Sequence, residues 1–236
     1  PERVQYIRTI MDELQRIDSH LLFFACLCMD MGALTAFFYG FRDREKVLDI
    51  LEQTTGGRLI QTYNTIGGVQ ADIHPDFVRK VKEFIAYMRP VLREYHEIFT
   101  GNVIAQERLK GTGVLTREDA ISFGATGGTG RAAGWACDVR KRHPYAVYGK
   151  VDFEEVLFTE GDCLARYMVR MREIEQSMHI IEQLIDNIPE GEYQLKMKPV
   201  IRIPEGSYYA AAVDWAAKNG IVNGVSETSF DPDAAI

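Results

Sequence analysis

The chain has 236 residues, of which 46% are hydrophobic, 11% aromatic and 26% charged. This composition is typical of a folded globular protein and excludes a disordered, collagenous or disulfide-stapled chain. The 27 basic and 34 acidic residues give a formal net charge of -7, which argues against a general affinity for nucleic acid phosphates. Because the chain starts at Pro1 without an initiating Met and stops at Ile236 without a polar tail, we expect a fragment of a longer protein.

The first 41 residues contain the longest helical pattern. Ile7, Ile10 and Leu14 belong to an apolar series with three- and four-residue spacing, so we predict one helix over residues 2–39 with an amphipathic first half. Its second half, residues 21–41, is apolar except for Asp30. That length permits a membrane span, but a carboxylate at the bilayer centre costs about 2.5–3.5 kcal/mol. We therefore predict a buried core helix whose carboxylate faces a cavity or a partner.

The helices and strands after residue 41 are predicted from the residues that typically begin and end such elements. We predict helices over 42–52, 76–99 and 160–188, and a short strand or extended loop over 58–75. Gly56 is placed to end the first of these helices in the left-handed conformation, and Pro90 is placed to kink the second. The glycine-dense stretch 101–144 predicts sharp turns or close backbone contacts.

Two possible ligand-binding motifs are weak. Residues 128–133 fit the relaxed dinucleotide fingerprint Gly-x-Gly-x-x-Ala, but the motif requires a preceding strand and the residues before it indicate a helical turn capped by Thr116. We expect these glycines to allow close packing around Trp135. Cys26 and Cys28, two residues apart on a helix, point about 200° away from each other and cannot chelate one ion. We therefore predict structural cysteines in a reducing compartment, and no metal site.

Asp30 is the one residue without a simple structural explanation. On a continuous helix it shares a face with Cys26 and Leu34, so its carboxylate needs a charged partner or a functional role. Both explanations stay open at this point. The candidate partners for a structural salt bridge are Arg8, Arg16, Arg42 and Arg44.

An ordered series of motifs resembles one known family. The stretches that carry the resemblance are residues 7–14, 29–38, 42–46, 66–69, 111–114, 124–134, 138–145 and 161–167. Together they are similar to the D subunit of NADH-quinone oxidoreductase, the respiratory complex I protein related to the large subunit of nickel-iron hydrogenases. The resemblance covers residues 1–207. A hydrogenase large subunit is the enzyme alternative, but it needs two Cys-x-x-Cys pairs for nickel, which this sequence lacks.

The resemblance implies a mainly α fold, the helical core of the hydrogenase large-subunit-like fold with short β and loop segments, truncated at both ends. It implies a peripheral subunit on the cytoplasmic face of the bacterial plasma membrane, with other complex I subunits and quinone as partners. Electrons from NADH would reach the quinone through an iron-sulfur cluster held by a partner subunit. The chain itself would hold no redox centre, so we expect the isolated fragment to be inactive.

The resemblance also assigns site residues. In that family an aspartate at the position of Asp30 pairs with a histidine that, with a tyrosine, binds the quinone headgroup; both would lie upstream of Pro1. Cys26 matches a position that lines the quinone cavity. Ile60 stands near the cluster, where many members carry a histidine that makes the cluster potential depend on pH. An apolar residue there suggests a lower-potential cluster and menaquinone as the substrate.

Residues 208–236 depart from the family pattern. They resemble most of one S-layer homology module, with Trp215 and Ile221 as expected core residues. Such modules bind cell-wall polymer, so a wall-anchored structural protein is a further alternative for the function of the chain. A cell-wall module would lie outside the cell, whereas the resemblance of residues 1–207 implies the cytoplasmic face. We therefore interpret residues 208–236 as a foreign segment, joined near residues 207–212.

Overall fold

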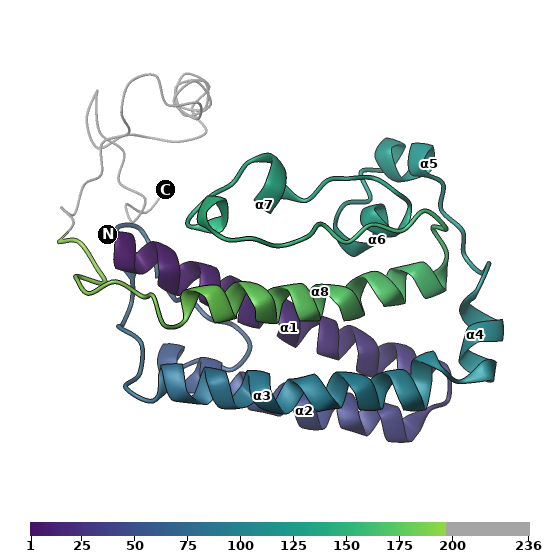
Figure 1. Ribbon diagram of the computed structural model, residues 1–236, viewed down its shortest axis with the longest axis horizontal. Helices are drawn as coiled ribbons and strands as arrows, with labels where there is room; N and C mark the ends of the chain where they lie inside the picture. Colours follow the sequence, from purple (N-terminus) through teal and green to yellow (C-terminus); the bar gives the residue numbers. More distant parts are fainter. Residues whose placement is uncertain (197–236) are drawn as a thin grey trace, which may run out of the picture. The chain divides into compact units, whose positions relative to one another are not determined.

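A computed structural model describes residues 1–196, and the predictions for residues 208–236 lie outside this range. Residues 1–194 form one unit. Its long helices are α1 (Glu2–Asp30), α2 (Leu34–Thr55), α3 (Phe77–Tyr95) and α8 (Cys163–Leu184). They lie side by side along the length of the unit, with α1 packed against both α2 and α8 (Figure 1). The mainly helical fold expected from the sequence is therefore confirmed.

The helix predicted over residues 2–39 is wrong in its continuity. α1 ends at Asp30, and α2 starts at Leu34 and runs back along α1 (Figure 1). Gly32 takes a left-handed conformation with φ 81°, which a residue without a Cβ adopts at low cost. The apolar run thus forms a helical hairpin. None of the helices within residues 1–196 has the length and apolar character of a membrane span.

Apolar burial on α1 explains why the hairpin is stable. Its buried apolar residues include those predicted from the three- and four-residue spacing, together with Phe24 and Cys28 nearer the end. Phe24 stacks on Tyr95 of α3, with ring centroids 4.0 Å apart. Full burial of a side chain of this size contributes about 1.5–3 kcal/mol. The core is therefore continuous from α1 to α3 and α8.

The connections agree with the sequence signals in most places. α2 ends at Gly56, whose φ of 79° is left-handed as predicted. Strands β1 (Asn64–Thr65) and β2 (Gly68–Val69) form a short antiparallel hairpin in the segment expected to be extended. α3 starts after Asp76, although the side chain of Asp76 makes no capping bond, and it continues through Pro90 into the π-helical turn η1 (His96–Thr100).

The glycine-rich segment folds into short helices, most of which lie along α8 on one side of the bundle, while the first lies at the end of the bundle (Figure 1). These are α4 (Val103–Leu109), α5 (Arg117–Ser122), α6 (Gly127–Ala132), α7 (Val139–Arg142) and the 3₁₀ turn η2 (Tyr148–Lys150). The fingerprint-like residues 128–133 begin inside α6 and follow the helix α5, so the strand required for a dinucleotide site is not there. Gly130 instead packs against Trp135, as expected, although Trp135 is only half-buried.

One close backbone contact fixes this segment at the start of α8. Gly161 has φ 64°, and a Cβ on it would lie 2.1 Å from the carbonyl oxygen of Leu115. The same two residues are bonded, because the Leu115 amide donates to the Gly161 carbonyl at 3.0 Å. Gly111 has a similar φ of 69° but no atom within 4 Å of a Cβ placed on it.

We predict that Gly161→Ala destabilises the chain more than Gly111→Ala. The left-handed conformation alone costs about 1–2 kcal/mol for a residue with a Cβ, and this applies to both variants. The contact with Leu115 adds about 1–3 kcal/mol for Gly161→Ala only. Urea unfolding of the 236-residue chain measures both free energies. Equal losses in the two variants would contradict the close contact.

Candidate functional site

Asp30 is the last residue of α1, and its side chain is exposed. The expectation of a buried carboxylate is wrong because the chain turns away at Gly32 and leaves the end of α1 open. Asp30 has no ion-pair partner among residues 1–196. The four arginines considered as partners bind elsewhere: Arg8 to the carbonyls of Thr65 and Gly68, Arg16 to Glu13, Arg42 to Asp43 and Glu94, and Arg44 to Asp18.

Cys26 lies one turn before Asp30 and is half-buried, whereas Cys28 is fully buried. The two thiols therefore lie on different sides of α1, as the helical spacing predicts. All four cysteines of the chain are free. Within residues 1–196, no three His, Cys, Asp or Glu side chains come together in a group that could hold a metal ion.

Exposed apolar side chains accompany Asp30. They lie at the end of α1, at the start of α2 and on α4, and include Met29, Leu34, Phe38, Val103 and Ile104. Phe38 is 63% exposed and Val103 is 72% exposed. Several large apolar side chains left open at one end of a fold indicate a surface that binds a partner or an apolar ligand. Asp30 and Glu107 of α4 are exposed carboxylates at this end of the fold.

Ile60 lies in the loop between α2 and β1 and is 92% exposed. Arg58, two residues earlier, pairs with Glu45, Asp49 and Glu52 on α2 and so fastens the loop to that helix. Asp30 precedes the start of α2 and Ile60 follows its end. A helix of 22 residues is about 33 Å long, so the structure does not bring the two predicted positions together.

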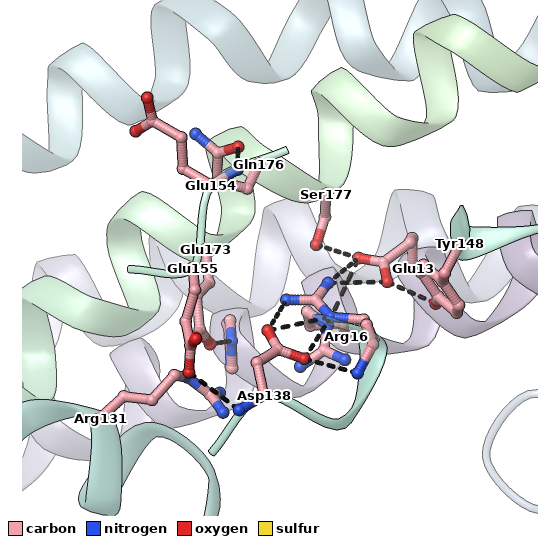
Figure 2. Close-up of polar contacts among 12 residues, drawn as sticks. Glu13, Arg16, Arg131, Asp138, Tyr148, Glu154, Glu155, Glu173, Gln176 and Ser177 are labelled. Atoms are coloured by element: carbon pink, nitrogen blue, oxygen red, sulfur yellow. Dashed lines mark hydrogen bonds and ion pairs between the residues drawn. The ribbon is translucent and has the colours of Figure 1, made fainter. Parts of the chain in front are cut away.

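A buried charge network, which the sequence reasoning missed, connects α1, α8 and the glycine-rich segment. Its centre is Glu13, whose side chain is 0% exposed. Arg140 donates from Nη1 to both carboxylate oxygens of Glu13, at 2.9 and 3.1 Å. The hydroxyls of Tyr148 and Ser177 also donate to it, each at 2.6 Å (Figure 2). Burial opposes ionisation of Glu13, but Arg140 and Arg16 outweigh it and hold the pKa of this carboxyl below its usual value.

A second part of the network is built around Glu173 of α8. Arg131 Nε donates to one carboxylate oxygen at 2.6 Å, and His20 Nε2 lies 2.7 Å from the other (Figure 2). Burial alone would raise the pKa of Glu173, but His20 and Arg131 together lower it to about 2. Burial lowers the pKa of His20, so this imidazole is neutral at pH 7 and donates to the carboxylate.

Asp138 completes the network. It pairs with Arg140 at 2.7 Å, and its backbone amide donates to Glu155 at 2.8 Å (Figure 2). The sequence contained one indication of this network. Glu13 lies three residues after Ile10 and four before Ile17, on the apolar face of its helix, which indicates a buried carboxylate. The network attaches the glycine-rich segment to α1 and α8.

The fold is a helical bundle, and the predicted site residues Asp30 and Ile60 are exposed on its surface. Residues 30–224 match the family model of the 49 kDa subunit of respiratory-chain NADH dehydrogenase. The chain therefore belongs to the family of this complex I subunit. The match extends to residue 224, beyond the domain boundary predicted at residue 207, which stays a prediction.

Curated relatives have the same family name. The chain is 86% identical over 210 residues to the C/D subunit of NADH-quinone oxidoreductase from Phocaeicola vulgatus, covering 89% of this chain and 40% of the relative. It is 43% identical over 233 residues to the D 2 subunit of NADH-quinone oxidoreductase from Opitutus terrae, covering 98% of this chain and 58% of the relative. The chain thus spans about half the length of these relatives.

A solved structure confirms the fold. A chain of the membrane-bound sulfane sulfur reductase, an archaeal respiratory membrane complex, superimposes with a TM-score of 0.81 at 38% sequence identity. The match covers 87% of this chain and 57% of that chain. The bundle described above is therefore a fold used in respiratory membrane complexes.

We predict a specific acid dependence of stability from Glu173. Its folded pKa of about 2 lies below the ordinary value of 4.5, so its contribution is complete above pH 4.5 and is lost as the pH falls through 2. The free energy of unfolding of the parent chain, minus that of Glu173→Gln, should therefore rise by about 3 kcal/mol between pH 2 and 4.5.

Chemical denaturation across this pH range measures the difference. Glu182→Gln is the matched control, because Glu182 forms an exposed ion pair with Arg89 that contributes little. Parallel pH curves for the parent chain and Glu173→Gln would contradict the assigned pKa.

Proposed function

We propose that the chain is part of the quinone-reducing subunit of an NADH-quinone oxidoreductase. The observation that carries the proposal is an exposed carboxylate, Asp30, at the end of a helix beside exposed apolar side chains, in a chain of the complex I 49 kDa family. A quinone combines a polar headgroup with an apolar tail. It fits a surface of this kind once the rest of the subunit and its partners enclose it.

The proposed reaction places specific demands on this end of the unit. Reduction of a quinone to the quinol takes up two electrons and two protons. An iron-sulfur cluster in a partner subunit supplies the electrons, which come from NADH. Asp30 serves as the acidic group that relays protons to the headgroup as the quinone is reduced. Cys26, one turn away on α1, lines the quinone cavity.

The loop that carries Ile60 is the proposed contact with the subunit that holds the cluster. Its anchoring by Arg58 and the exposure of Ile60 support such a contact. The side chain of Ile60 has no titratable group, so it gives the cluster potential no dependence on pH. We infer a lower-potential cluster and menaquinone as the substrate.

The partners follow from the exposed surfaces. Both ends of α2 present apolar side chains that other subunits of the complex are proposed to cover. The assembled subunit would lie peripherally on the cytoplasmic face of the plasma membrane. Alone, the chain is proposed to catalyse no quinone reduction, because its electron donor belongs to another subunit.

We predict that Asp30→Asn, in an intact complex that carries this subunit, lowers the rate of quinone reduction at least about tenfold, or about 1.4 kcal/mol. The amide keeps the shape of the side chain but exchanges no proton. Oxidation of NADH by an artificial acceptor that bypasses the quinone should be unchanged. Asp186→Asn, an exposed carboxylate paired with Lys82, is the control and should leave both rates unchanged. Unaltered quinone reduction in Asp30→Asn would refute the role of this residue.

We predict that Ile60→His makes the potential of the partner's cluster depend on pH. A histidine beside the cluster binds a proton more tightly when the cluster is reduced, so the midpoint potential should fall by up to about 59 mV per pH unit near its pKa. Redox titration of the intact complex at several pH values measures this slope. Ile66→His, at a second exposed position, is the control. A pH-dependent potential in the parent complex would contradict the assignment of Ile60.

A further inference from the structure

Arg108 of α4 contacts the turn next to Asp30. Its Nη1 donates to the carbonyl oxygen of Met31 at 3.1 Å, across 77 residues of sequence. α4 lies at the same end of the bundle as the end of α1 (Figure 1). The contact therefore links the glycine-rich segment to the turn of residues 31–33, directly after Asp30.

The end of α1 has an unfavourable arrangement of charge. The last turn of a helix carries partial negative charge from its free carbonyl groups, and cations there are stabilising. The last turn of α1 contains no basic residue, and it ends with the carboxylate of Asp30. Two negative charges therefore meet at this point. The guanidinium of Arg108, bound one residue further along, is a cation placed where the helix lacks one.

The backbone amides of the turn bond back to α1, and no backbone amide among the described residues donates to the Met31 carbonyl. The amides of Met31, Gly32 and Ala33 donate back to the carbonyls of Leu27, Met29 and Cys28, which closes the end of α1. The Met31 carbonyl accepts from Arg108 instead.

α4 itself is well anchored. The side chain of Asn102 accepts from the amides of Ile104 and Ala105, and Gln106 donates to the Thr100 carbonyl at 2.6 Å. Ala105 and Leu109 are buried. Because the buried side of α4 packs against the bundle, the helix provides a fixed base from which Arg108 binds the Met31 carbonyl.

We propose that Arg108 is a positioning residue for the quinone site. It fixes the turn after Asp30 and offsets the repulsion between this carboxylate and the helix end. This inference rests on the proposed function, and Arg108 acts through Asp30 and not as a catalytic residue.

The test uses Arg108→Gln and Arg108→Lys in the intact complex. Arg108→Gln should raise the KM for quinone about five- to tenfold, while NADH oxidation by the bypassing acceptor stays unchanged. Arg108→Lys keeps the cation and should recover most of the loss. Arg93→Gln, an exposed arginine at the end of α3, is the control and should leave the KM unchanged.

A double variant separates positioning from a general structural role. If Arg108 acts through Asp30, Asp30→Asn combined with Arg108→Gln should lose no more activity than Asp30→Asn alone. An unchanged KM in Arg108→Gln, additive losses, or failure of both Arg108 variants to assemble would overturn the inference. If Asp30→Asn also leaves quinone reduction unchanged, the proposed function fails; if only the Arg108 variants are unaffected, this inference alone fails.

Discussion

The carboxylate of Glu13 is the constraint on which the rest of the structure depends. It is fully buried, and it binds groups from α1, from the glycine-rich segment and from α8. A buried charge is tolerated only when its partners replace the water it has lost, and removal of one partner typically costs about 3–5 kcal/mol. The segment of residues 101–150 also buries apolar side chains in the core, among them Leu109, Val147 and Tyr148. The contacts of Arg140 add an ionic link between this segment and α1.

The sequence predicted the elements whose signals are local. Helix ends at Gly56 and Thr116 follow from left-handed glycine and side-chain capping, which the structure confirms. The break after Asp30 was missed because the apolar pattern continues on both sides of Gly32, and a single glycine does not by itself distinguish a helix end from a tolerated glycine within a helix. The exposure of Asp30 is a consequence of that break. The Glu13 network was out of reach, since its partners lie up to 164 residues apart and no periodicity connects them.

The resemblance to the D subunit of complex I identified the family, whereas physical reasoning from the residues alone located a single candidate residue. This difference has a physical cause. In the proposed function other chains complete the site, so Asp30 and Ile60 are exposed in this chain and neither burial nor a cavity marks them. Asp30 stands out in the sequence because it is a charged residue within an apolar run. In the structure this residue lies at the surface and not in the core.

The 22-residue helix α2 also acts as a spacer of fixed length. Asp30, the proposed proton relay, lies just before its start, and Ile60, the proposed contact with the electron donor, lies in the loop after its end. Because a helix of this kind is rigid over its length, changes at one end leave the geometry of the other intact. Under the proposed function the two positions are separate, so a substitution at position 60 would change the surroundings of the electron donor without altering the acid group.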